Sequence, residues 1–405
     1  MSEPGAAMAL PDRRVVVTAL GLVQILAWGS TFYLLGVLGK PIAADTGWPY
    51  DWVIGGVSVG LAVAGMVSPR VGHLIGDRGG RPILAGAAIL LALGLALLGA
   101  AQNFVWYLAA WVVIGAGMGA GLYDAAFSTL GGIYGSAARP AITSVTLFGG
   151  FASTVCWPLS AYLVEHLGWR GACFTYAALH IGVALPLMLF ALPARAAALP
   201  HTGSANGEKP RVKLERSEWP VFALLAAVVT IGAATLSIIG MHLLTLLQAR
   251  GLTLAAAVAL GAIIGPAQVG ARVVEMVVGR HYHPIWTMVA AAVLVAIGTG
   301  LLFTGLPVYA LAVVFYGAGN GIGSVARGTL PLALFGPGRY AVLMGRLALP
   351  ILVAMALSPY LAALALQGGG AELTLGLLAA LAASNVVLVA LLWSFSARAR
   401  KGETG

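Results

Sequence analysis

The chain has 405 residues, of which 60% are hydrophobic and only 9% are charged, and its mean hydropathy is +0.95. Soluble domains carry roughly 25% charged residues, so this composition excludes an ordinary water-soluble globule and predicts a bundle of membrane-spanning helices. A net charge of +9 would suit nucleic-acid binding in a soluble protein. In a membrane protein, the positions of the basic residues along the chain matter more than the total charge. The two cysteines, Cys156 and Cys173, lie in apolar segments and are expected to be packing residues.

The apolar segments are long enough to cross a membrane, since a hydrocarbon core of about 30 Å takes roughly 20 helical residues. The first segment is too long for the core of a signal peptide, and no small-residue cleavage site follows it. We therefore predict an all-α membrane protein with twelve transmembrane helices, at residues 15–39, 52–73, 82–101, 104–133, 139–163, 172–193, 219–247, 254–278, 285–304, 307–334, 338–365 and 372–396.

The basic residues lie mostly on one side of these predicted spans. With the N-terminus inside, fifteen of the 22 lysines and arginines fall on the cytoplasmic side, and only Lys40, Arg170 and Arg250 fall in the outer connections. This bias predicts that both termini are cytoplasmic and explains the basic charge without nucleic acid. We expect a multi-pass protein of a cell inner or plasma membrane.

Two halves of the chain are similar at an offset of 202 residues. GAGMGAG at 115–121 matches GAGNGIG at 317–323, and these glycines are expected to allow close helix packing. Three further matches in the same register are Arg70 with Arg272, Arg78 with Arg280, and Pro82 with Pro284. We predict a duplicated six-helix unit, with one bundle at residues 1–193, a polar cytoplasmic linker at 194–218 and a second bundle at 219–405.

A charged cluster separates the second and third predicted spans. It resembles the D-R-x-G-R signature of the major facilitator superfamily and consists of Asp77, Arg78, Gly80 and Arg81. The family's leading glycine is replaced by His73 and its final basic residue by Pro82. The resemblance implies two six-helix bundles that rock around a midplane site and so transport a small solute by alternating access.

The signature loop also has a physical role of its own. Its carboxylate can accept hydrogen bonds from the first amides of a neighbouring helix, and its arginines can pair with acids at facing helix ends. Such contacts would hold the cytoplasmic side closed. The alternative, that Arg78 and Arg81 only set the topology, stays open.

Six ionisable residues fall inside the predicted spans, where each is a candidate for function because an unpaired charge in the membrane is costly. They are Arg70, Asp124, Arg272, Glu275, Arg327 and Arg346. We predict a gate pair between Asp124 and either Arg70 or Arg78, with Asp124 as a proton carrier as the alternative. A second gate pair is predicted between Glu275 and Arg327.

These pairs leave Arg272 and Arg346 in surplus, which suggests an anionic substrate bound by forked hydrogen bonds. The arrangement resembles the oxalate/formate antiporter and monocarboxylate transporter branches, which place basic residues on their eighth and eleventh helices. We therefore expect an organic anion such as a carboxylate. Other candidates for contact with the substrate are Arg327, Asn320, Trp28, Tyr33 and Tyr123.

Several motifs are absent from the sequence. It contains no G-x-x-x-x-G-K-[ST] and no H-E-x-x-H, so neither ATP hydrolysis nor another enzymatic activity is expected. The expected partners are one small-molecule substrate, membrane lipids and a coupling proton, with no cofactor, no metal and no nucleic acid, in a monomer. An efflux carrier for a neutral, metalloid or drug-like compound remains an alternative, as does a membrane sensor derived from a transporter.

Overall fold

The computed structural model describes residues 12–193, 214–216 and 218–402, and these are almost entirely helical. The predicted linker at 194–218 therefore lies largely outside the described residues. The first part of the chain forms α1 (Arg13–Gly29), α2 (Leu35–Thr46), α3 (Tyr50–Arg78), α4 (Gly80–Gly99), α5 (Phe104–Gly121), α6 (Tyr123–Tyr134), α7 (Arg139–Gly150), α8 (Ala152–Leu179) and α9 (Leu185–Ala191). The second part forms α10 (Trp219–Ala249), α11 (Leu254–Val278), α12 (Pro284–Thr304), α13 (Tyr309–Phe335) and α14 (Pro337–Gly402).

Eight helical segments in the described ranges are long and apolar enough to cross a membrane. Two of them, Phe104–Ala191 and Pro337–Ser396, contain 88 and 60 residues, far more than the roughly 20 that one crossing takes. Both segments contain a glycine with positive φ, Gly168 at 68° and Gly370 at 67°, a conformation that other residues adopt only with strain. Each of these two segments is therefore long enough for more than one crossing.

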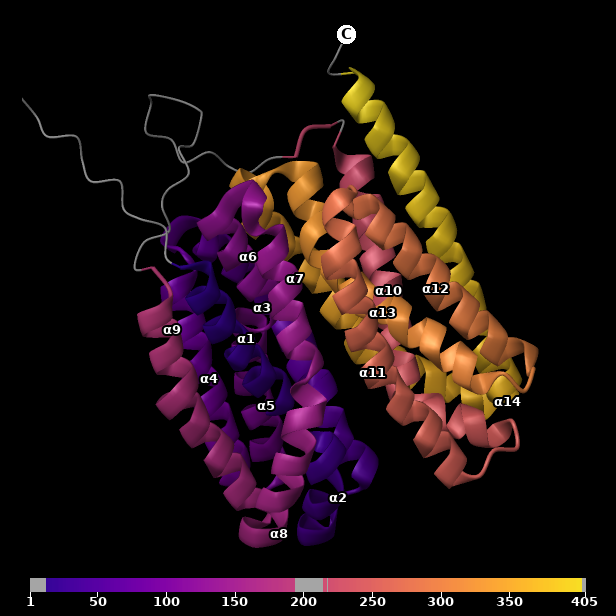
Figure 1. The fold of residues 1–405 in the computed structure, drawn as a ribbon. Coiled ribbons are helices and arrows are strands. Elements are labelled where there is room, and N and C mark those ends of the chain that lie inside the picture. Colours follow the sequence, from indigo (N-terminus) through magenta and orange to yellow (C-terminus); the bar gives the residue numbers. More distant parts are fainter. Residues whose placement is uncertain (1–11, 194–213, 217, 403–405) are drawn as a thin grey trace, which may run out of the picture.

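Figure 1 shows two sets of helices side by side: the first helix group, α1–α9, coloured indigo to magenta, and the second helix group, α10–α14, coloured pink to yellow. Helix α1 begins and α14 ends at the same face of the molecule, which we call the terminus face. At the opposite face, Arg170 donates to the carbonyls of Gly99 and Ala101. Arg250 similarly donates to the Phe303 carbonyl, so each arginine joins turns within one group.

Three segments predicted as single spans are interrupted near mid-depth. The span at 15–39 is broken by the turn at residues 30–34, the span at 104–133 by the extended Leu122, and the span at 139–163 by Phe151. A break leaves backbone groups without helical partners, and side chains satisfy some of them. Gln24 Nε2, for example, donates to the Gly121 carbonyl at 2.7 Å.

Glycines of the repeated motif bring helices into close contact, as the sequence predicts. A Cβ placed on Gly119 would lie 2.7 Å from the Ala64 carbonyl oxygen, and one on Gly321 would lie 2.5 Å from that of Gln268. Helices α5 and α13 thus pack in the same way, on α3 and α11 respectively. The repeat is a packing feature in both halves of the chain.

Candidate functional site

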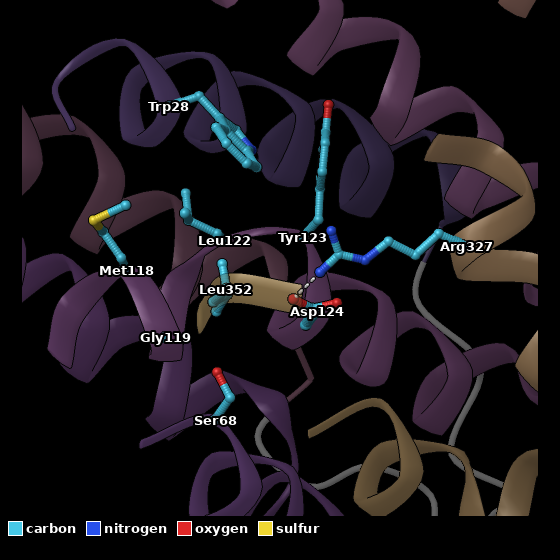
Figure 2. A pocket seen from close by; sticks show the side chains of 9 residues that line it. All are labelled: Trp28, Ser68, Met118, Gly119, Leu122, Tyr123, Asp124, Arg327 and Leu352. Carbon is cyan, nitrogen blue, oxygen red and sulfur yellow. Dashed lines mark hydrogen bonds and ion pairs between the residues drawn. The ribbon is translucent and has the colours of Figure 1, made fainter. Parts of the chain in front are cut away.

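Asp124 and Arg327 form an ion pair that joins the two helix groups. Asp124 lies in the first turn of α6, directly after the break at Leu122, and its Oδ2 is 2.5 Å from Nη2 of Arg327 on α13 (Figure 2). Asp124 is 8% exposed. The two residues lie ten and eight positions before the terminus-face ends of their helices, which corresponds to depths of about 15 Å and 12 Å.

The prediction that Asp124 pairs with Arg70 or Arg78 was wrong. Both arginines are exposed on α3, and Arg78 is the last residue of that helix, about three helical turns from the depth of Asp124. The side chain of Arg327 on α13 reaches Asp124 instead, with Nη2 2.5 Å from Oδ2. The partner of Asp124 therefore comes from the other helix group rather than from the signature loop.

The ion pair borders a small cavity of about 10 Å³, close to the minimum size that holds one water molecule. Asp124 Oδ1 and Arg327 Nε are buried and make no hydrogen bond to the described residues. The pair thus keeps one acceptor and one donor unused. The lining residues are Trp28, Ser68, Met118, Gly119, Leu122, Tyr123, Asp124, Arg327 and Leu352 (Figure 2).

Aromatic rings of α1 and α6 meet beside this cavity. The ring of Trp28 lies 5.1 Å from that of Tyr123 and 6.5 Å from that of Tyr33, measured between centroids. Trp28 Nε1 donates to Gln24 Oε1, and Gln24 in turn holds the Gly121 carbonyl. The break between α5 and α6 is therefore coupled to the position of Trp28.

Arg272 on α11 is only 5% exposed and bonds to neutral acceptors. Its Nη1 donates to the Thr146 carbonyl of α7 at 2.8 Å, and its Nε to the Gly321 carbonyl of α13 at 3.1 Å. A longer bond of 3.5 Å joins its Nη2 to Gln268 Oε1. Among the residues that the structure describes, no carboxylate forms an ion pair with Arg272.

The hydroxyl of Tyr123 donates to the same Thr146 carbonyl as Arg272 Nη1, at 3.4 Å, and the rings of Tyr123 and Tyr33 both pack against the ring of Trp28. These tyrosines belong to the first helix group, whereas Arg272 belongs to the second. The structure thus brings three of the predicted site residues together around the contact between the groups.

Glu275 pairs with an arginine that the sequence analysis counted only as a topology charge. Arg139 Nη2 lies 3.1 Å from Glu275 Oε1, and the same carboxylate accepts from Thr287 at 3.0 Å. Arg139 also donates to the carbonyls of Gly279 and Tyr282. The predicted Glu275–Arg327 pair was therefore wrong, because Arg327 is engaged by Asp124.

The signature loop lies at the terminus face between α3 and α4. Asp77 and Arg78 are exposed, and Arg81 is half-buried. Gly80 begins α4, and a Cβ at this position would overlap the side chain of Thr129 on α6. Its glycine is thus required by the packing of α4 against α6.

Arg346 and Asn320, two further predicted contacts of the substrate, are half-buried on α14 and α13. Arg346 follows Gly345, where α14 meets α3: a Cβ on Gly72 would lie 3.1 Å from the Gly345 Cα. Arg272 instead lies where α11 meets α7. Arg272 and Arg346 therefore belong to different contacts between the helix groups.

Comparison with known families decides the assignment. The sequence profile described as Major Facilitator Superfamily matches residues 20–281, which is well over half of the chain. The chain belongs to the Major Facilitator Superfamily. It is accordingly an integral, multi-pass membrane protein and a transporter of this superfamily rather than an enzyme. None of the curated proteins compared with it matches significantly in sequence.

Solved structures of the superfamily share the fold. The human organic anion transporter MFSD10 (TETRAN) superimposes with a TM-score of 0.74 at 18% identity, covering 94% of this chain and all of that one. FucP in the outward conformation superimposes with a TM-score of 0.67 at 15% identity, and the match covers 93% of this chain and 98% of that one. A second structure of FucP, the E. coli fucose:proton symporter, has a TM-score of 0.68 at 14% identity, and the match covers 93% of this chain and 97% of that one. At such identities the similarity establishes the fold alone.

Proposed function

We propose that this superfamily member transports a small organic anion, most directly a carboxylate, by alternating access. One observation carries the proposal: Arg272 is buried at the contact between the helix groups and has neutral acceptors only, among the described residues. A buried cation without a counter-charge is costly, and a carboxylate that binds it with two parallel hydrogen bonds relieves this cost. Arg346, Arg327 and Asn320 are the further polar contacts in this proposal.

The charges around Arg272 support this assignment. Asp124 neutralises Arg327, and Glu275 neutralises Arg139. The positive charge of Arg272 is left uncompensated by these acids. The rings of Trp28, Tyr33 and Tyr123 offer apolar surface to the body of the anion, and the hydroxyl of Tyr33 offers a hydrogen bond.

The proposed topology is twelve transmembrane helices in two duplicated bundles, residues 1–193 and 219–405, joined by a linker at 194–218. The terminus face is cytoplasmic in this proposal, because the basic residues gather there. The Asp124–Arg327 and Arg139–Glu275 pairs then form the cytoplasmic gate together with residues 77–81 and Arg70. The protein acts as a monomer in an inner or plasma membrane.

Transport of an anion against its gradient requires an energy source. A proton gradient suits this site, and Asp124 is the more suitable acceptor of the two gate acids because its Oδ1 has no hydrogen-bond partner among the described residues. Glu275 is already bonded to Arg139 and Thr287. Protonation of Asp124 would weaken its hold on Arg327 and so favour opening of the gate.

A thermal-shift screen of the purified protein tests the anion site. A ligand that binds only the folded state stabilises it by RT ln(1 + [L]/Kd), about 2.7 kcal/mol at a hundredfold excess over Kd. We expect acetate, benzoate, pyruvate or oxalate to raise the melting temperature of the wild type, and the effect to vanish in Arg272→Gln. Gly270→Ala, on the same helix with open space at its Cβ, is the matched control.

The screen includes neutral sugars and cationic drugs at equal ionic strength. Stabilisation by these compounds, unchanged in Arg272→Gln, would refute the anion assignment in favour of a neutral or drug-like substrate. Uptake of the stabilising carboxylate into proteoliposomes, with and without an imposed pH gradient, then distinguishes a working carrier from a membrane sensor.

A further inference from the structure

Helices α7 and α11 come from different helix groups and hold each other by two arginines. Arg139, the first residue of α7, donates to the Gly279 carbonyl at the terminus-face end of α11. Arg272 of α11 donates to the Thr146 carbonyl of α7. The two helices are antiparallel, and seven residues separate the two bonded positions on each of them. We call these two arginine bonds the rungs of the contact; they lie about 10 Å apart along the helices.

The two rungs differ in how they respond to an anion. Arg139 is bound by the carboxylate of Glu275 as well as by carbonyls, so a substrate anion has little to offer it. Among the residues that the structure describes, Arg272 is bound across the contact by one carbonyl, that of Thr146 in the last part of α7, where the helix carries the partial negative charge of its C-terminus. A carboxylate offers this guanidinium a full opposite charge and two parallel hydrogen bonds, which a single carbonyl cannot, so it competes effectively with the Thr146 carbonyl.

Gly150 creates the space that Arg272 occupies. A Cβ on Gly150 would overlap Arg272 Nη1, and one on Gly149 would overlap the hydroxyl of Tyr123. These are the last two residues of α7 before the break at Phe151. Gly150 thus allows the guanidinium to lie close enough to α7 to reach the Thr146 carbonyl.

The corresponding contact elsewhere in the duplicated fold contains two closely packed glycines. Adding the offset of 202 places Gly72 of α3 at position 274 of α11, and subtracting it places Gly345 of α14 at position 143 of α7. There a Cβ on Gly345 would lie 2.5 Å from the Ser68 carbonyl and 3.1 Å from the Gly72 Cα. The α3–α14 contact therefore consists of closely packed glycines near the level at which arginine bonds join α7 and α11.

We propose that the α7–α11 contact is a latch that the substrate anion releases: the anion draws Arg272 away from the Thr146 carbonyl, and Gly150 is the positioning residue that seats Arg272 in the latched state. This inference rests on the proposed function and adds the step that links binding to opening of the terminus face. In this proposal the close backbone contact between Gly72 of α3 and Gly345 of α14 persists when the anion binds and acts as the pivot.

A single-cysteine reporter tests the latch. Ile142 of α7 is fully buried against the second helix group, where a Cβ on Gly328 would lie 2.7 Å from its Cγ2. The rate at which a maleimide labels Ile142→Cys in the purified protein therefore reports opening of the terminus face. The parent protein, whose Cys156 and Cys173 are both buried, gives the background.

We expect benzoate, pyruvate or oxalate, whichever raises the melting temperature, to increase labelling of Ile142→Cys at least threefold. Gly150→Ala and Arg272→Lys should each raise labelling without ligand. The methyl group of Gly150→Ala displaces the guanidinium group, and Arg272→Lys replaces the planar guanidinium and its several N–H donors with a single ammonium group. Gly270→Ala should label at the rate of the reporter protein alone. Melting temperatures of all variants show whether each is folded.

The outcomes separate the latch from the proposed function. If no carboxylate shifts the melting temperature, the proposed function fails and the latch fails with it. If a carboxylate binds through Arg272 but leaves labelling unchanged, the latch alone is overturned. Equal labelling of Gly150→Ala and Gly270→Ala, both folded, would also overturn it.

Discussion

Arg139, Arg272 and Arg327 all reach from one helix group to the other, yet each guanidinium group meets different acceptors. Arg327 bonds a buried carboxylate, Arg139 bonds a carboxylate and two carbonyls, and Arg272 bonds carbonyls and an amide oxygen. A buried ion pair adds little net stability, but the loss of one partner leaves an uncompensated charge. The three arginines should therefore respond differently to substitution.

Removal of one partner of the Asp124–Arg327 pair is expected to be strongly destabilising. Arg327→Gln leaves the carboxylate of Asp124 buried and unpaired, which costs about 3–5 kcal/mol. The double variant Asp124→Asn with Arg327→Gln should recover much of this loss, because neither charge remains. Thermal melts of the purified single and double variants measure the effect. Single variants that melt at the wild-type temperature would contradict the pairing.

At the scale of helices, the ends of α10 and α14 are joined at the terminus face. Arg339, in the first turn of α14, donates from Nη1 and Nη2 to the two carboxylate oxygens of Glu218, each at 2.6 Å. Glu218 directly precedes α10. These hydrogen bonds lower the pKa of Glu218 from its usual 4.5. The link is partly exposed to solvent, so its contribution to stability is modest.

This link predicts a pH dependence. Because the pKa of Glu218 is lowered in the folded protein, its stabilisation is fully present above the unfolded value of about 4.5 and is lost as the pH falls through the folded value. The melting temperature of the wild type should exceed that of Glu218→Gln at pH 7, and the gap should narrow below about pH 4.5. Thermal melts of both proteins from pH 7 to pH 3 measure this difference in melting temperature. A difference that stays constant over this range would refute the stabilising role of the Arg339–Glu218 pair.

At the scale of the whole molecule, the two helix groups meet through contacts of unlike chemistry. Glycines let the backbones of α3 and α14 touch, whereas arginines bridge α7 and α11. Close backbone contacts allow no room for added atoms, so the glycine contact should tolerate substitution poorly. In the proposed latch mechanism, this contact persists while the α7–α11 contact breaks.

Gly72→Val tests the role of the glycine contact. The added side chain would overlap the Ala341 carbonyl of α14 and force the groups apart at the terminus face, so labelling of Ile142→Cys should rise and carboxylate uptake should fall at least tenfold. Gly76→Val, one turn further along α3 and only in ordinary contact with Val342, is the control. Wild-type uptake in folded Gly72→Val would exclude this contact as a pivot.

The sequence by itself determined the membrane class, the helical fold and most helix positions; the predicted span at 254–278, for example, coincides with α11. It did so because hydropathy adds up locally along the chain and a crossing needs a fixed length. The repeated glycines and the resemblance of residues 77–81 to a family signature were likewise local features.

Only the tertiary structure decided which charges meet. Asp124 pairs with Arg327 rather than with Arg70 or Arg78, and Glu275 pairs with Arg139 rather than with Arg327. The sequence also did not predict the space beside Gly150 that Arg272 occupies. Such pairings depend on the rotation and register of helices that lie far apart in the chain, and a small rotation of one helix exchanges the partners. The sequence lists the charged residues in the membrane, but the packing of the two helix groups selects their partners.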